Sequence, residues 1–541
     1  MQGLMMEVPL LISSLIRHAD RYHGDAEIVS RTVEGPIHRY TYRDAHARAR
    51  RLARALARLG VAPSDRIGTL AWNGYRHFEL YYAVSGMGAI THTINPRLFR
   101  DQLAYIINHA EDNIVFFDLT FVPLVEQLAA VCTGVRHWVA MTDREHLPKA
   151  NLPGLLCYED LLAAESDDFD WPEFDENTAA ALCYTSGTTG NPKGVLFSHR
   201  SSILHAYAIS LPDTKCLSAS SAVLAIVPMF HVNAWGIPYA APLVGCKLVF
   251  PGPALDGASL YHLLESEAVD STSAVPTVWM NLIDYMQQNK LRFSTLRHTT
   301  IGGSACPPAL IKTLSEDLGV RVMHGWGMTE MSPVGTLNAA KRKHADASAE
   351  ARFQLSLKQG RPLYGVDMKI VDGEGRELAR DGKSAGSLLV RGPWVLRRYY
   401  KDAGDPLTAD GWLPTGDVGT IDADGYLQIT DRSKDVIKSG GEWISSIELE
   451  NIAVGHPAVL EAAVIGVPHA KWTERPLLIV VKRPGAELTR ETLLAFYDGK
   501  IARWCLPDDV VFVEELPHTA TGKLSKRMLR ERFRDYRLPT G

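Results

Sequence analysis

Apolar side chains recur at helical spacing early in the chain. Between Thr41 and Gly60 an apolar residue appears every three or four positions, which predicts an amphipathic helix that residues 41–44 open and that continues through residues 45–59. The apolar positions of this helix are Ala45, Ala49, Leu52, Ala53, Leu56 and Leu59. Threonine and glycine are residue types that begin and end helices, so the boundaries agree with the periodicity. Residues 9–16 carry another apolar run, followed at once by charged residues, and predict the start of a second amphipathic helix.

Short apolar runs of strand length alternate with helical segments over the next part of the chain. A helix is predicted over residues 78–87. The predicted strands are residues 66–70, 89–93, 115–117, 139–141, 180–184, 222–227, 247–250, 299–301 and 320–324. Such alternation is typical of doubly wound parallel sheets, in which helices cover both faces.

The pattern changes near residue 361, where short strands with Gly and Asp turns begin. These strands are predicted at residues 368–371, 386–391, 419–421 and 425–429. After Asp431 the predicted elements are a helix (447–453), two strands (461–467 and 476–482), a helix (490–500) and a strand (510–513). We therefore expect an α/β chain of two bodies. Residues 1–430 form doubly wound sheets plus a β-rich subdomain, and residues 431–541 form a small α+β domain.

The composition excludes several classes of protein. Among 541 residues, 57 are basic and 62 acidic, a net charge of −5, and no basic surplus points to nucleic acid. No run approaches the roughly 20 apolar residues that cross a bilayer. The seven cysteines form no C-x-x-C pair, and the N-terminus lacks a basic region of the kind that begins a secretory signal. A cytoplasmic chain without a disulfide framework is expected.

A glycine-rich loop follows the predicted strand 180–184. Residues 185–194 read TSGTTGNPKG, with four hydroxyl side chains, three glycines and one lysine. Glycines let the backbone approach a ligand closely, and successive N–H groups can then surround an anion. The candidate phosphate contacts are Thr185, Ser186, Gly187, Thr188, Thr189, Gly190 and Lys193. A plain polar hairpin loop has a similar composition, whereas a Walker P-loop is excluded because Pro192, not glycine, precedes Lys193.

This loop resembles the phosphate loop of the AMP-forming acyl-CoA synthetases, a family of adenylating enzymes. Further motifs occur in the order typical of that family: residues 228–231 (PMFH), 302–305 (GGSA), 325–330 (GWGMTE), 415–417 (TGD), 431–438 (DRSKDVIK), 441–445 (GEWIS) and 521–523 (TGK). The resemblance spans essentially the whole chain. It implies two half-reactions: a carboxylate attacks the α-phosphate of ATP to give an acyl-adenylate, and the thiol of coenzyme A then displaces AMP.

The resemblance also implies a nucleotide site. Its residues beyond the loop are Gly303, Ser304, Ala305, His324, Gly325, Trp326, Thr329, Asp417 and Arg432. Trp326 would stack on adenine, and Asp417 with Arg432 would hold the ribose. Glu330 with Thr185 would hold Mg²⁺ beside the phosphates, since this ion prefers hard oxygen ligands. Each residue type also has an ordinary structural use: a tryptophan fills cores, an aspartate caps turns, and a glutamate caps helices.

Lys523 is implied as the catalytic lysine, which bridges the carboxylate and the α-phosphate; a lone loop lysine is otherwise a solvated surface charge. Lys434 matches the hinge about which the C-terminal domain rotates between half-reactions, although an ordinary linker would look alike. The implied coenzyme A contacts are Lys438, Gly440, Gly441 and Trp443. Arg475 and Lys526 are basic residues near that segment, either phosphate contacts or surface charges.

The resemblance places His231 and Trp235 at the acyl pocket, where a bulky tryptophan shortens the space for the acid. A short- to medium-chain acid is expected, with 3-methylmercaptopropionate favoured and medium-chain fatty acids as the alternative. Two other functions stay open: an adenylating enzyme that loads a separate carrier protein, and a nucleotide-binding protein without turnover. The expected partners are ATP, a carboxylic acid and coenzyme A, with no nucleic acid; any self-association is expected to give a homodimer.

Overall fold

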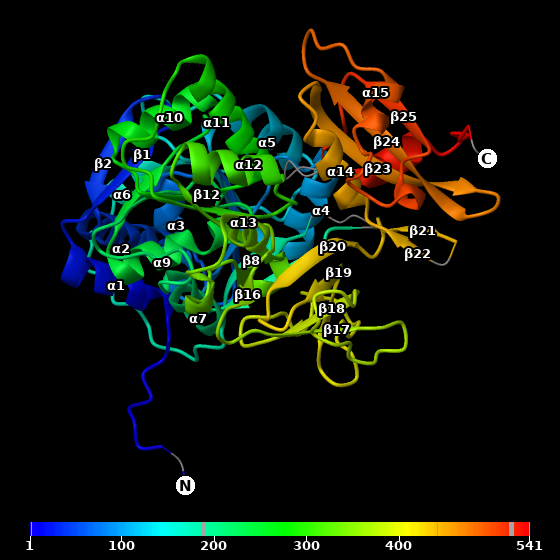
Figure 1. Cartoon of the computed structure of the whole chain (residues 1–541). Helices are drawn as coiled ribbons and strands as arrows, with labels where there is room; N and C mark the ends of the chain where they lie inside the picture. The colour runs from blue at the N-terminus through cyan, green and yellow to red at the C-terminus, as the bar shows by residue number, and fades with distance from the viewer. Residues whose placement is uncertain (2, 186–190, 441, 519–523, 540–541) are drawn as a thin grey trace.

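The computed structural model describes residues 1, 3–185, 191–440, 442–518 and 524–539. Two large sheets and a small antiparallel sheet make up the part of the chain before residue 433. The C-terminal part, coloured orange to red in Figure 1, carries its own sheet and lies beside the rest of the molecule.

One large sheet has seven strands in the order β7-β6-β5-β3-β4-β8-β9. Its neighbouring strands run parallel, except that β9 is antiparallel to β8. The bounds are β3 Arg66–Leu70, β4 Ile90–Thr93, β5 Asp112–Phe117, β6 His137–Ala140, β7 Leu155–Cys157, β8 Ala179–Tyr184 and β9 Gly194–Ser198.

The other large sheet has nine strands in the order β16-β15-β14-β13-β12-β10-β11-β1-β2. Its central strands from β14 to β1 are parallel, and antiparallel strands close both edges. The bounds are β1 Glu27–Arg31, β2 Ile37–Thr41, β10 Ala222–Leu224, β11 Lys247–Phe250, β12 Ser271–Ala274, β13 His298–Ile301, β14 Arg321–Gly327, β15 Val334–Leu337 and β16 Arg361–Pro362. The predicted doubly wound sheets are thereby confirmed.

Helices lie between the two large sheets and on their outer faces. The inner helices share one apolar core with strands of both sheets: α1 Ile12–His23, α2 Tyr42–Arg58, α3 Tyr75–Gly86, α7 His199–Ser210 and α9 Ile237–Val244. The helices that pack on the outer faces are α4 Arg100–Ala110, α5 Val122–Ala129, α10 Gly257–Ser266, α11 Pro276–Gln288 and α12 Pro308–Lys312. Helices α6 Tyr158–Ala163, α8 Val232–Trp235 and α13 Ala349–Ser356 complete this part.

Local chemistry explains where α2 begins and ends. The hydroxyl of Thr41 accepts the N–H of Asp44, and the Asp44 carboxylate accepts the N–H of Thr41 at 2.9 Å, a reciprocal cap. Gly60 has φ +81°, the left-handed conformation that glycine adopts without steric cost. The predicted helix is therefore confirmed: it begins at Tyr42, directly after Thr41, and ends at Arg58.

The remaining strands form two smaller sheets. The first is antiparallel: β17 Asp367–Val371, β18 Gly386–Arg391, β19 Leu413–Ile421 and β20 Leu427–Arg432. The C-terminal part contains β21 Ile437–Ser439, β22 Glu442–Ile444, α14 Ser446–Val454, β23 Val459–His469, β24 Thr473–Lys482, α15 Arg490–Ala495, β25 Asp509–Val513 and α16 Lys526–Arg532. Its apolar core is separate from that of the large sheets. The predicted helix over 490–500 is shorter in the structure, because α15 ends at Ala495.

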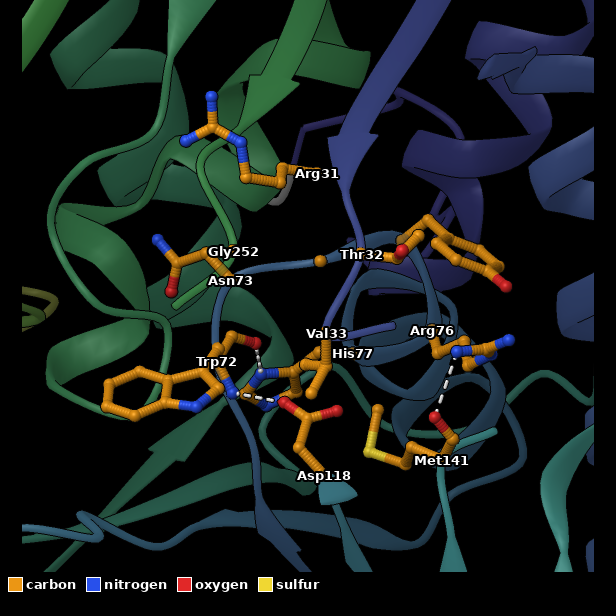
Figure 2. Close-up of a pocket in the computed structure, with 12 residues that line it drawn as sticks. Arg31, Thr32, Val33, Trp72, Asn73, Arg76, His77, Asp118, Met141 and Gly252 are labelled. Atoms are coloured by element: carbon orange, nitrogen blue, oxygen red, sulfur yellow. Dashed lines mark hydrogen bonds between the residues drawn. The ribbon is translucent and has the colours of Figure 1, made fainter. Parts of the chain in front are cut away.

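A small cavity lies where strands of the two large sheets end. Residues after β1, β3, β5, β6 and β11 line it (Figure 2). Its volume of about 20 Å³ has room for about one water molecule. Asp118 is buried at this cavity and accepts the backbone N–H of Trp72 at 2.7 Å. Burial raises the pKa of Asp118 to about 7, even though the Trp72 N–H favours the charged form.

This shift makes the stability of the fold depend on pH. The pKa of Asp118 is higher in the folded than in the unfolded protein. Its contribution to the free energy of unfolding is therefore complete below about pH 4 and is lost as the pH rises through 7. Asp118→Asn keeps an oxygen for the Trp72 N–H and does not ionise. We expect it to raise the free energy of unfolding relative to wild type by about 2–4 kcal/mol at pH 8, with a smaller difference at pH 5. Unfolding midpoints measured from pH 5 to 8 check this, with exposed Asp498→Asn as control; parallel pH profiles for Asp118→Asn and wild type would contradict it.

Candidate active site

Several of the sequence motifs follow the carboxyl ends of parallel strands in the two large sheets. Residues 302–305 follow β13, and residues 325–330 begin at the end of β14, which is paired in parallel with β13. The glycine-rich loop leaves β8 of the other large sheet. Ligands of open α/β sheets bind outside the carboxyl ends of the strands, so this edge is the candidate site.

The described ends of the glycine-rich loop are closed by hydrogen bonds. Thr185 N–H donates to the carbonyl of Lys193 at 2.9 Å, and Lys193 N–H donates to the Thr185 hydroxyl at 3.3 Å. Tyr184 and Gly194 are partners in the antiparallel pair of β8 and β9. The predicted contacts Ser186, Gly187, Thr188, Thr189 and Gly190 lie outside the described residues.

Three predicted nucleotide contacts meet at one carboxylate. Asp417 is 5% exposed; its Oδ2 accepts the indole N–H of Trp326 at 2.8 Å, and its Oδ1 lies 3.2 Å from Nε of Arg432. Asp417 and Arg432 face each other across the pair of β19 and β20. The candidate base-stacking residue and the candidate ribose contacts are thus held together, although 91 residues separate Trp326 from Asp417.

Two glycine-rich turns bring backbone against backbone beside this carboxylate. A Cβ atom at Gly302 would lie 3.0 Å from the carbonyl oxygen of Gly325, and one at Gly325 would lie 2.7 Å from the Leu337 side chain. Gly303 has φ +84°, so the turn after β13 needs glycine. Ser304 is exposed and Ala305 half-buried, so this small-residue turn leaves backbone accessible to a flat ligand.

Glu330 belongs to a cluster with a residue that no motif pointed to. Glu330 is buried, and its Oε1 accepts the hydroxyl of Tyr399 at 2.7 Å. The Nζ atom of Lys193 lies 4.7 Å from the centre of the Tyr399 ring and 3.4 Å from the Asp402 carboxylate. Tyr399 therefore joins the predicted metal ligand to the lysine of the glycine-rich loop. Burial and the Glu330 carboxylate raise the pKa of Tyr399, so its hydroxyl stays a donor.

Thr329 is buried beside Glu330 in a single helical turn, Thr329–Met331. His324 lies earlier on β14 and points into the protein, where Nδ1 is 2.9 Å from the carbonyl oxygen of Leu357. Burial lowers the pKa of His324 to about 4, so it is neutral near pH 7. His324 can therefore reach a nucleotide through its backbone but not as a cation.

The predicted acyl-pocket residues sit on an unusual turn. From Val232 to Trp235 every φ lies between 46° and 52°, and Gly236 continues at 81°. Left-handed backbone costs a residue with a side chain about 1–2 kcal/mol, and a β-branched residue such as Val232 rarely adopts it. His231 precedes this turn and is half-buried, whereas Trp235 is buried. The Cη2 atom of Trp235 lies 3.4 Å from where a Cβ of Gly302 would be, so Trp235 adjoins the candidate nucleotide site.

The C-terminal motifs lie on exposed structure near the start of the C-terminal part. Lys434 is exposed between β20 and β21, and Lys438 and Trp443 are exposed partners in the hairpin of β21 and β22. A Cβ at Gly440 would lie 2.7 Å from the exposed ring of Trp472, a second aromatic residue that the motifs did not indicate. The predicted residues Gly441 and Lys523 lie outside the described residues.

Arg475 and Lys526 are used for ion pairs within the C-terminal part. Arg475 Nη2 lies 2.6 Å from the Asp508 carboxylate, and both side chains are largely buried. Lys526 Nζ lies 2.7 Å from Glu450 and donates to the Ser446 hydroxyl at 2.6 Å. These contacts favour structural roles for both cations over binding of phosphates.

Buried Asp431 ties the start of the C-terminal part to β20. Its Oδ2 accepts both the backbone N–H of Ser446, at 2.6 Å, and the Ser446 hydroxyl, at 2.7 Å. Ser446 is the first residue of α14, and the hydroxyl of Ser445 donates to the carbonyl of Thr430. Exposed Lys434 lies between this contact and β21 in the chain.

The residues around Glu330 fit Mg²⁺ held mainly by nucleotide phosphates. This ion is usually bound through one or two carboxylates plus water and phosphate oxygens, not by a cage of protein ligands. Among the described residues, no three His, Cys, Asp or Glu side chains gather into a metal cluster. A carboxylate that keeps an oxygen beyond its Tyr399 bond, with a threonine hydroxyl at the loop base, matches that donor set.

Comparison with known proteins identifies the family of this chain. Residues 15–400 match the family model described as AMP-binding enzyme, and residues 448–523 match that of the AMP-binding enzyme C-terminal domain. Two large, mostly parallel sheets with covering helices, followed by a small C-terminal sheet, are the fold of an adenylate-forming enzyme, here an AMP-forming acyl-CoA synthetase. The chain belongs to the AMP-binding enzyme family.

Full-length relatives carry specific names. The chain is 53% identical to a 3-methylmercaptopropionyl-CoA ligase of Ruegeria lacuscaerulensis, with 99% of each chain covered. It is 51% identical to a medium-chain-fatty-acid–CoA ligase of Ectopseudomonas oleovorans, covering 99% of this chain and 98% of the relative. Among solved structures, ATP-bound MatB from Rhodopseudomonas palustris superposes with a TM-score of 0.81 at 26% identity, covering 97% of this chain and 99% of that one. In the described residues, no helix is long and apolar enough to cross a membrane.

Proposed function

We propose that this enzyme ligates 3-methylmercaptopropionate, or a saturated acid of similar length, to coenzyme A through an acyl-adenylate. The nucleotide half of the proposal rests on the Asp417 carboxylate, which Trp326 and Arg432 hold in place. The choice of acid is supported by the named relatives and by Trp235, which adjoins the nucleotide site and limits the room for the chain.

In the first half-reaction, a carboxylate oxygen of the acid attacks the α-phosphorus of ATP and pyrophosphate leaves. Trp326 stacks on adenine, Asp417 and Arg432 hold the ribose, and the glycine-rich loop with Lys193 holds the departing phosphates. Lys523 contacts the acid and the α-phosphate, where negative charge grows as the bond forms. Glu330 and Thr185 hold Mg²⁺, which when bound offsets charge on the phosphates.

In the second half-reaction, the coenzyme A thiolate attacks the acyl carbon and AMP leaves. We propose that residues 431–541 rotate as one domain relative to residues 1–430, with Lys434 as the hinge. A hinge is a few residues that absorb a large backbone change, and Lys434 lies exposed between the last strand of one sheet and the first of the next. Rotation brings Lys438, Gly440, Gly441 and Trp443 to the acyl-adenylate, and the two glycines leave space for a slender thiol arm.

An AMP-release assay tests the proposed acid. With ATP, Mg²⁺ and free coenzyme A, we expect the highest kcat/KM with 3-methylmercaptopropionate and with saturated acids of about four to eight carbons. Because pocket walls discriminate by about one to two orders of magnitude for a few methylenes, acids of twelve or more carbons should react at least tenfold less efficiently. A maximum at long chains would refute the short acyl pocket.

The same assay separates this function from an enzyme that loads a carrier protein. A ligase releases AMP and forms a thioester with free coenzyme A as the sole acceptor. An enzyme dedicated to a carrier protein would form the adenylate and pyrophosphate but transfer little acyl group to coenzyme A. The named relatives, which are coenzyme A ligases over their full length, favour the first outcome.

A further inference from the structure

A buried lysine lies near the ring of Trp235. Lys215 lies in the segment after α7 and is 2% exposed. Its Nζ donates to the hydroxyl of Ser273 on β12 at 2.6 Å. Within the described ranges, no Asp or Glu oxygen lies within 4 Å of this ammonium group. Neither the sequence motifs nor the proposed reaction uses Lys215.

Burying a lysine side chain in this way costs free energy of folding. Moving a charged amine out of water without a counter-charge is strongly unfavourable, and one hydroxyl satisfies only one of its three donors. Burial accordingly lowers the pKa of Lys215 to about 7. A methionine of similar length would fill the same space without this cost, so packing alone does not explain a lysine.

The position of Lys215 links it to the candidate acyl pocket. Its Nζ lies 5.6 Å from the centre of the Trp235 ring, and that ring lies against Gly302. Ser273, which holds the amine, pairs with Thr300 on β13, two residues before Gly302. The amine, which Ser273 holds, thus places a polar group beside the Trp235 ring.

We propose that Lys215 determines chain-length specificity by making the space behind Trp235 polar. This inference rests on the proposed function, because it takes the space beside Trp235 and Gly302 as the acyl pocket. An acid that ends before Trp235 leaves the amine undisturbed. A longer alkyl chain has to displace the indole, which removes its contact with Nζ, and then place methylenes against a desolvated amine. The residue acts as a specificity determinant for short acids and takes no part in bond formation.

The test compares chain-length profiles of Lys215→Met and wild type. The measured quantity is the ratio of kcat/KM for dodecanoate to kcat/KM for butanoate, so that defects in ATP or coenzyme A binding cancel. We expect the ratio to rise about tenfold in Lys215→Met, roughly the value of two buried methylenes. Lys290→Met, at an exposed position, is the matched control and should leave the ratio unchanged.

If Lys215→Met does not fold, the pH dependence of the same kcat/KM ratio in the wild-type enzyme tests the proposal independently. As the pH rises through about 7 the amine loses its charge, so the ratio should rise between pH 6 and 8.5. Burial and, to a smaller extent, the charge of Lys215 lower the pKa of His205 to about 3, so His205 stays neutral in this range. Ser273 and Trp235 do not titrate there. Ser273→Ala removes an acceptor of the charged amine and should move the rise to lower pH.

The outcomes distinguish this inference from the proposed function. If Lys215→Met folds and its ratio of kcat/KM for dodecanoate to that for butanoate equals the wild-type ratio, the role of Lys215 is overturned. If Lys215→Met does not fold, a wild-type ratio that does not change with pH overturns the role of Lys215. Either result leaves the ligase activity standing. A wild-type enzyme that forms no acyl-CoA from any acid overturns the proposed function and this inference together.

Discussion

Replacing Lys523 by alanine is expected to slow acyl-adenylate formation about 10²–10³-fold while leaving much of the second half-reaction intact. The cation acts where charge grows on the α-phosphate as the carboxylate attacks, so it stabilises the transition state more than bound ATP. Coenzyme A attack on a preformed adenylate has a different charge distribution and, in the proposed scheme, occurs after the C-terminal domain has turned. Pyrophosphate exchange measures the first step, and thioester formation from supplied acyl-adenylate measures the second.

Alanine variants of two other lysines in the C-terminal part serve as controls for Lys523→Ala. Lys500→Ala removes an exposed cation from this part and should leave both steps unchanged. Lys526→Ala should instead lower stability, because Lys526 is largely buried against Glu450 and Ser446. Equal loss of both half-reactions in Lys523→Ala would show that the residue is structural and not the catalytic cation.

The large sheets were predictable wherever burial left a continuous apolar run. The runs that contain β3, β8 and β11 were predicted at nearly their observed positions because these strands are buried on both faces. Strand β2 was missed because it lies at the edge of its sheet and reads IHRYT, in which alternate positions are exposed and three residues are charged or are polar with a ring. Strand β12 was missed because its four residues, STSA, are buried yet mostly hydroxylic, and Thr272 hydrogen-bonds a neighbouring strand.

The contacts among the candidate site residues were less predictable than the motifs that contain them. Motifs indicated Trp326, Asp417 and Glu330, but the bond between Trp326 and Asp417 depends on how two sheets pack. Tyr399 and Lys215 carried no motif, because each acts through one contact with a residue distant in sequence. An isolated tyrosine or lysine has many ordinary uses. The contact of Tyr399 with the Glu330 carboxylate and the burial of Lys215 are visible only once the chain has folded.

The second large expected effect concerns the Glu330 carboxylate, which accepts a hydrogen bond from the Tyr399 hydroxyl. Glu330→Gln removes the negative oxygen proposed to hold Mg²⁺, and we expect kcat for adenylate formation to fall at least about 10²-fold. Tyr399→Phe keeps the carboxylate but removes the 2.7 Å bond that orients it. Loss of such an outer partner typically costs 10–100-fold, so Tyr399→Phe should raise the Mg²⁺ concentration for half-maximal rate about tenfold. Mg²⁺ titrations of pyrophosphate exchange at fixed ATP measure both effects.

Tyr400→Phe is the matched control, because it deletes the hydroxyl of the adjacent tyrosine and preserves the part of Tyr400 that contacts the loop. Tyr400 contributes its backbone N–H, which donates to the Gly194 carbonyl at 2.8 Å and is unaffected by the substitution. A positioning role for Tyr399 requires that the Mg²⁺ dependence change in Tyr399→Phe and not in Tyr400→Phe, with the KM for coenzyme A unaltered in both. If both variants keep the wild-type Mg²⁺ dependence, the hydroxyl of Tyr399 does not orient Glu330 for metal binding, and its bond serves only to satisfy a buried carboxylate.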